Sequence, residues 1–215
     1  MRKAILCVWA VLAILAYAGL AWADDPVVEP SEKQDKQTVE ERQQQRKEAL
    51  EAAMTGKDFD KAISLLDEMI ADKEVSDDEK FMAEFTEFVI QAKEKNDGAK
   101  ACPLAKKLAE TKKDDPQILN ELSWTILDTK DLKDRDLDVA LEIAQRAAEV
   151  SKYENSAILD TLARAHFEKG DVDKAIEFQT KAVEKGANDE EITDEIRTQI
   201  KETLEKYKAK KAETK

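Results

Sequence analysis

A pair made of an aspartate and an alanine four residues later occurs four times in this chain, and it constrains the fold more than any other feature. The alanines are 39, 39 and 35 residues apart, and the pairs are Asp58/Ala62, Asp97/Ala101, Asp136/Ala140 and Asp171/Ala175. Another apolar residue follows each alanine after seven positions: Met69, Leu108, Ala147 and Ala182. Aspartate is a good helix N-cap, and residues seven apart share one helix face. A period of this length therefore predicts stacked helical hairpins.

The clearest hairpin is predicted over residues 155–186. Leu159, Leu162 and Ala163 recur at helical spacing, and a second apolar stripe follows Ala175. Lys169, Gly170 and Asp171 lie between the two stripes and predict a tight turn. A hairpin this small cannot bury its own stripe, so it requires neighbours of the same kind.

Further helices are expected on both sides of the repeats. Residues 40–54 are polar and predict an exposed terminal helix, whereas residues 189–208 carry one narrow apolar stripe and predict a helix that covers the last hairpin. Pro103 is tolerated near the start of a helix, so its helix should begin at or just before Ala101. The sequence thus predicts an all-α repeat domain over residues 38–208.

Composition excludes several classes of protein. Five glycines and four prolines among 215 residues are too few turn residues for a β-sandwich or barrel. A net charge of -13 argues against nucleic-acid binding, because phosphates are repelled. Cys7 lies in the leader described below and Cys102 stands alone in the remainder, so neither an intrachain disulfide nor a zinc site is expected there.

The first 23 residues have the layout of a secretory signal peptide. Arg2 and Lys3 precede an apolar run, and Ala21-Trp22-Ala23 fits a cleavage site. The alternative is an uncleaved anchor, since residues 4–23 are long enough to span a bilayer. We therefore expect export to the periplasm or secretion, with membrane contact only if the anchor is retained. Residues 24–37 and 209–215 predict a disordered linker and a disordered basic tail.

The segment LDTLARAHFEKGDVDKAIEFQTKAVEKG resembles a tetratricopeptide repeat (TPR), and NELSWTILD with DVALEIAQRAAEV looks like a second copy. The resemblance implies an α-solenoid of about four antiparallel hairpins plus a capping helix. Members of this family bind proteins or peptides in a concave groove lined by the first helix of each hairpin, and they are not generally enzymes. Carried onto this sequence, the groove positions are Asn120, Trp124, Leu127, Asp160, Arg164 and Phe167.

Some of these residues have alternative interpretations. Trp124 suits a peptide anchor, or it packs under the long turn at residues 128–134. Asp160 and Arg164 bind a polar ligand, or form an ordinary ion pair within one helix. His166, the single histidine, falls at a packing position and favours a core role. Cys102 is a small core residue, or a reactive thiol near a helix start.

The sequence contains no nucleophile–base pair, phosphate-binding glycine loop or calcium loop. We therefore expect a non-catalytic scaffold that binds a protein or peptide and needs no cofactor, metal or small-molecule substrate. Two alternatives are a docking subunit of a larger envelope enzyme assembly and a redox-sensitive protein that acts through Cys102.

Overall fold

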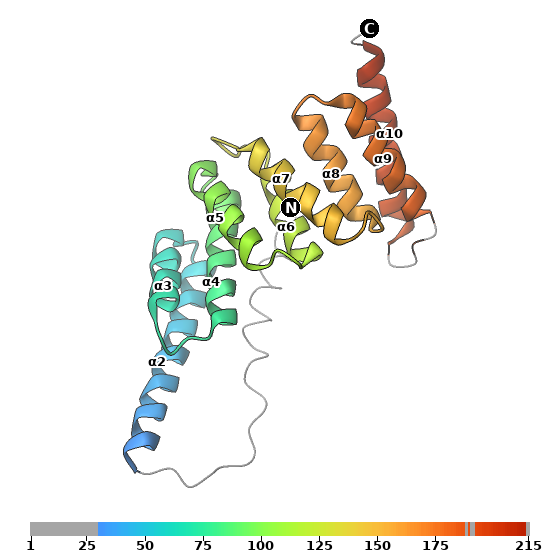
Figure 1. Ribbon diagram of the computed structural model, residues 1–215. Helices are drawn as coiled ribbons and strands as arrows, with labels where there is room; N and C mark the ends of the chain where they lie inside the picture. The colour runs from blue at the N-terminus through green and yellow to red at the C-terminus, as the bar shows by residue number, and fades with distance from the viewer. Residues whose placement is uncertain (1–29, 188, 190–191, 214–215) are drawn as a thin grey trace. The chain divides into compact units, whose positions relative to one another are not determined.

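The computed structural model describes residues 30–187, 189 and 192–213, with side chains from Val39 onward (Figure 1). Helices account for most of this part of the chain, and it holds no strand beyond an isolated bridge between Asp97 and Lys133. The chain divides into two compact units, which meet between Ile90 and Gln91. The predicted signal peptide or anchor at residues 1–23 lies outside the described residues.

Unit one contains three described helices: α2 (Pro30–Thr55), α3 (Phe59–Ala71) and α4 (Asp77–Val89). Helix α3 packs against both of the others. Their apolar faces meet in a small core made of Leu50, Ala53, Ala62, Leu66, Met69 and Ala83. Only the last third of α2 contributes to this core, and of the described side chains of that helix, from Val39 to Thr55, only Leu50 and Ala53 are buried.

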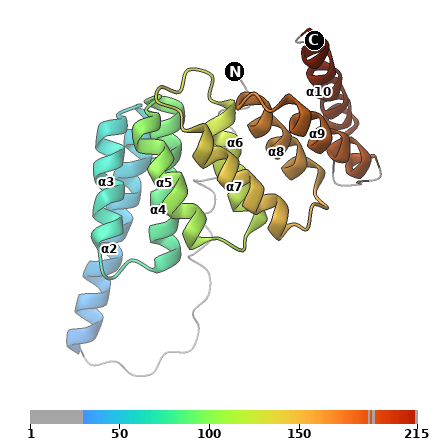
Figure 2. The same ribbon diagram turned by 45° about the horizontal axis from the view of Figure 1, so that its top comes forward.

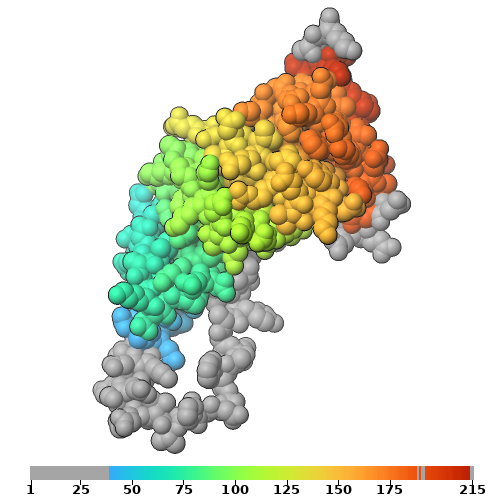
Figure 3. Space-filling view, in the orientation of Figure 1, coloured from blue at the N-terminus to red at the C-terminus, as the bar shows by residue number. Residues whose placement is uncertain are grey.

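The boundary between the units falls within a short π-helical segment (Ile90–Glu94), and unit two contains the helices that follow it. They are α5 (Gly98–Thr111), α6 (Pro116–Asp128), α7 (Leu137–Val150), α8 (Ser156–Glu168), α9 (Val172–Gly186) and α10 (Asp194–Glu213). Helices α6 and α7 pack as one pair and α8 and α9 as the next, with α10 against α9 (Figures 1 and 2). In the space-filling view, the gold atoms of α7 adjoin the orange atoms of α8 (Figure 3).

The four aspartates begin helices as predicted. Each accepts a hydrogen bond from a backbone N–H in the first turn of its helix: Asp58 for α3, Asp97 for α5, Asp136 for α7 and Asp171 for α9. The alanine four residues later is fully buried in every case. The hairpins α6–α7 and α8–α9 are therefore confirmed, whereas the second predicted pair is divided, with α4 in unit one and α5 in unit two. A continuous solenoid stays a prediction.

Three predicted boundaries differ from the structure. Residues 30–37 belong to α2 and residues 209–213 to α10, in place of a disordered linker and tail. Proline fits a first helical turn, and the glutamate, glutamine, lysine and alanine residues that follow have high helix propensity. Helix α10 begins at Asp194 and not at Asp189, because the Thr193 hydroxyl accepts a hydrogen bond from the Ile196 N–H at 3.3 Å.

Proline at position 103 lies inside α5, which starts three residues before Ala101. None of the described helices is both long and apolar enough to cross a bilayer. The possible anchor at residues 4–23 is not among them.

Candidate functional site

A groove of about 490 Å³ lies in unit two between helices α6, α8 and α10. We call it the α6–α8–α10 groove. Helix α6 contributes Asn120, Glu121 and Trp124, and α8 contributes Asp160, Arg164 and Phe167 among others. These helices are the first members of the two confirmed hairpins, so corresponding positions of the two repeats face one cavity.

Five of the six residues predicted to line a groove do so. The exception is Leu127, whose side chain is 1% exposed and belongs to the core. Helix α6 packs against both α7 and α8, so the side chain at position 127 is enclosed near the end of that helix. The prediction that the Leu127 side chain lines the groove is therefore wrong. Only its backbone carbonyl contacts a groove residue, by accepting a hydrogen bond from Arg164 at 3.2 Å.

Helix α10, which the sequence predicts only as a cover for the last hairpin, also forms the third wall of the groove. It lines the groove with one face, which carries Ile196, Gln199, Thr203, Lys206 and Tyr207. Of the predicted stripe, Ile200 and Leu204 are buried, but Ile196 is 39% exposed at the groove. The continuation of the stripe from Leu204 to Tyr207, three residues later, is the sequence signal that could have identified this wall.

Two aromatic contacts organise the groove. The guanidinium of Arg164 lies over the Trp124 ring, 5.0 Å from its centroid. The Phe167 ring stacks on Tyr207 with a centroid separation of 4.2 Å. Trp124 therefore lies in the groove and not under the long turn. Tyr207 ties α10 to α8, and burial raises the pKa of its hydroxyl, as does the negative charge of Asp160.

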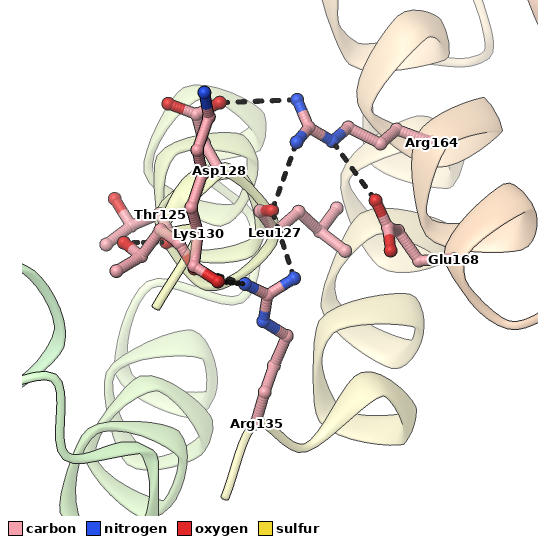
Figure 4. A network of polar contacts seen from close by, with 8 residues as sticks. Thr125, Leu127, Asp128, Lys130, Arg135, Arg164 and Glu168 are labelled. Atoms are coloured by element: carbon pink, nitrogen blue, oxygen red, sulfur yellow. Dashed lines mark hydrogen bonds and ion pairs between the residues drawn. The ribbon is translucent and has the colours of Figure 1, made fainter. Parts of the chain in front are cut away.

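Arg164 also contacts the end of α6, as Figure 4 shows. Its guanidinium reaches Asp128 at 3.3 Å and Glu168 at 3.9 Å, and it donates to the Leu127 carbonyl. The predicted ion pair with Asp160 is replaced by these contacts. Carboxylates and carbonyls on two helices thus hold this guanidinium over Trp124.

Arg135 closes the same helix end from the following loop. It donates to the backbone carbonyls of Leu127, Thr129 and Lys130, which are left without helical partners where α6 ends (Figure 4). A positive charge at a helix C-terminus also interacts favourably with the negative end of the helix dipole. The loop between α6 and α7, although longer than its counterpart after α8, is therefore anchored.

Replacing Arg135 with alanine should lower the free energy of unfolding by about 2 kcal/mol, the range for hydrogen bonds from a charged donor. Urea unfolding followed by circular dichroism measures this loss. Lys133→Ala is the matched control, because that exposed side chain lies in the same loop and its substitution should cost less than about 0.5 kcal/mol. Equal losses in the two variants would show that Arg135 does not anchor the loop.

Asp160 is held by a neutral partner at the base of the groove. Its Oδ1 accepts a hydrogen bond of 2.5 Å from Gln179 Nε2, which also donates to the Ile200 carbonyl at 3.1 Å. Gln179 is fully buried and joins α8, α9 and α10. Burial raises the pKa of Asp160, although the Gln179 hydrogen bond and the Arg164 charge act in the opposite direction.

Asp160→Asn should stabilise the protein at pH 7, by an amount on the order of 1 kcal/mol. A pKa raised by folding favours the folded state at low pH, and this contribution is lost as pH rises through the folded-state pKa. Asparagine keeps the acceptor for Gln179 without the buried charge. The gain in melting temperature should therefore shrink as pH falls toward 4, and Glu184→Gln, on the exposed face of α9, should show no such trend.

Asn120, on the α6 wall of the groove, carries a hydrogen-bond acceptor without a donor among the described residues. The Oδ1 atom of Asn120 is buried and has no hydrogen-bond partner in the described part of the chain. An unsatisfied buried acceptor of this kind costs about 1–3 kcal/mol. Asn120 lines the groove, but this oxygen atom is not accessible from it in the structure.

His166 and Cys102 lie away from the groove. His166 is 6% exposed and stacks on Phe178, with ring centroids 5.4 Å apart, and burial lowers its pKa. Its predicted packing role is confirmed. Cys102 is 2% exposed, its Sγ accepts a hydrogen bond from the Asp136 N–H, and burial raises its pKa. These properties fit the predicted small core residue and oppose the alternative of a reactive thiol.

Within residues 39–213, as far as they are described, no three histidine, cysteine, aspartate or glutamate side chains are grouped to hold a metal ion. The groove lining instead combines aromatic rings, the Arg164 guanidinium, the Lys206 ammonium, carboxylates and neutral polar groups.

Comparisons with known proteins give a limited result. No protein-family model matches the chain, and no curated protein matches it. Chains of solved structures do match, among them one described as "MamA MSR-1 C2", at 15% identity and a TM-score of 0.45. That match covers 79% of this chain and 96% of the other.

Proposed function

We propose that this chain is a non-catalytic scaffold of TPR-like hairpins that binds a protein or peptide segment in the α6–α8–α10 groove. The observation that carries the proposal is the meeting of two aromatic contacts and the Asp160 carboxylate in one groove. Aromatic side chains dominate the energetics of protein interfaces, and convergent polar groups fix the orientation of what binds.

The form of the groove favours a polypeptide segment as its occupant. Its walls are three helices, and its lining combines polar groups with rings and aliphatic side chains. An extended segment presents N–H donors and side chains at regular intervals, which suits such a surface. The fixed positions of Arg164 and Tyr207 reduce the entropy lost on binding.

Selection from a random dodecapeptide library tests the proposal. Peptides selected on the purified protein should bind at least tenfold more weakly to Trp124→Ala. Tyr153→Ala is the matched control, since it removes an aromatic ring from unit two outside the groove. If the selected peptides bind both variants with the same affinity as they bind the wild type, the binding site lies elsewhere.

We further propose that the scaffold is exported and acts in the periplasm or cell envelope, with residues 1–23 removed as a signal peptide. The basic start, the apolar run and the Ala21-Trp22-Ala23 site support cleavage before Asp24. Mass spectrometry of the protein made with its leader in a bacterial host should give a chain that begins at Asp24. An intact chain in the membrane fraction would favour the anchor.

A further inference from the structure

The polar side chains of the groove differ in the hydrogen-bond and ion-pair partners that the described part of the chain gives them. Asn120 Oδ1 has no hydrogen-bond partner in the described part of the chain, and the Asp160 carboxylate is held by the neutral Gln179 amide. These residues are at corresponding positions, each four residues before the stacked pair Trp124 and Arg164. Of these two acceptors, the Asp160 carboxylate lines the groove, whereas Asn120 Oδ1 is buried.

Among the described residues, the groove has two cationic side chains, and the one between α6 and α8, Arg164, is already engaged. Arg164 contacts Asp128, Glu168 and the Leu127 carbonyl, and it covers Trp124. Lys206 lies at the exposed edge of α10, where its ammonium is 5.9 Å from the Phe167 ring centroid. An anionic ligand at Arg164 would have to displace existing contacts of that side chain, whereas a cationic ligand meets the Asp160 carboxylate, which has no ion pair among the described residues.

We infer that the α6–α8–α10 groove recognises a basic segment of its partner, with a lysine or arginine side chain against Asp160. This inference rests on the proposed function. The ammonium or guanidinium donates to the Asp160 carboxylate, which lines the groove. The aliphatic stem of the basic side chain packs on Trp124 and on Ile196, which is exposed at the groove.

Two further features agree with this occupant. The net charge of -13 attracts a basic segment toward the protein and raises its association rate. A cation in direct contact with Asp160 compensates the desolvation of that carboxylate, so a residue that destabilises the free protein becomes favourable in the complex.

The test repeats the dodecapeptide selection on the wild type, Asp160→Asn and Glu184→Gln. Both substitutions remove one negative charge, but Glu184 is exposed on α9 and outside the groove. Lysine and arginine should be enriched among peptides selected on the wild type and on Glu184→Gln, and not on Asp160→Asn. Long-range attraction alone would affect the two variants equally, and that result would overturn the inference.

A double-mutant cycle then locates the contact. For a selected peptide, changing its basic residue to norleucine should weaken binding to the wild type at least tenfold and leave binding to Asp160→Asn nearly unchanged. Selected peptides that are apolar or acidic but still require Trp124 would overturn this inference and leave the proposed function intact. Peptides that do not require Trp124 would contradict the proposed function itself. Self-association of the protein that Asp160→Asn abolishes would identify a second copy as the occupant and overturn a separate partner.

Discussion

Gly98→Ala is expected to destabilise unit two by about 3 kcal/mol, at the upper end of the range for overpacking substitutions. A Cβ atom at this position would lie 2.2 Å from the Lys133 carbonyl oxygen and 2.7 Å from that of Asp134. Both atoms belong to the backbone, so no side-chain rotation relieves the clash. The Gly98 N–H also donates to the Lys133 carbonyl at 2.8 Å, and a shift of the chain would break this bond.

Gly186→Ala is the matched control for this experiment. Its nearest neighbour would be the terminal Cδ1 atom of Ile192 at 3.1 Å, which is the end of a flexible side chain. We expect a loss below about 1 kcal/mol for this variant, and a clearly lower urea midpoint for Gly98→Ala, both followed by circular dichroism. Similar midpoints would mean that the loop at residues 133–134 moves away at little cost.

Gln179→Ala should cost about 3 kcal/mol and weaken the attachment of α10. The substitution leaves a cavity in a fully buried position and removes the sole neutral donor described for Asp160. It also removes the hydrogen bond to the Ile200 carbonyl, which joins α9 to α10. Because α10 is one wall of the groove, peptide binding should fall together with stability.

The buried charge should account for part of this loss. With asparagine at position 160, removal of Gln179 leaves a neutral amide and not a carboxylate without a donor, so the cost should be smaller by about 1 kcal/mol. Gln199→Ala, at an exposed position of α10, should change stability by less than about 0.5 kcal/mol. An identical cost of Gln179→Ala in both backgrounds would show that Asp160 and Gln179 are not coupled.

Helix starts could be predicted from the sequence because their causes are local. An aspartate that accepts a hydrogen bond from the first turn and an alanine four residues later are both within one helical segment, and the structure confirms them at Asp58, Asp97, Asp136 and Asp171. The groove positions of α6 and α8 followed from the same period, since equivalent residues of successive hairpins face the same side.

The remainder depends on contacts between distant segments. Leu127 is enclosed where α6 meets its neighbours, and Tyr207 reaches the groove through its stacking on Phe167. Neither contact can be predicted from the spacing of apolar residues along a single helix. The partner of Asp160 was predicted four residues away in the same helix, but Gln179, 19 residues away, competes successfully because it is buried beside the carboxylate.

The order of the three groove walls along the chain has a consequence for biosynthesis. Helices α6 and α8 leave the ribosome well before α10, since Glu168 precedes Asp194 by 26 residues. Asp160 and Phe167 are therefore made before Gln199, Lys206 and Tyr207, the groove residues of α10. The groove that we propose as the binding site is complete only once the chain extends to Tyr207.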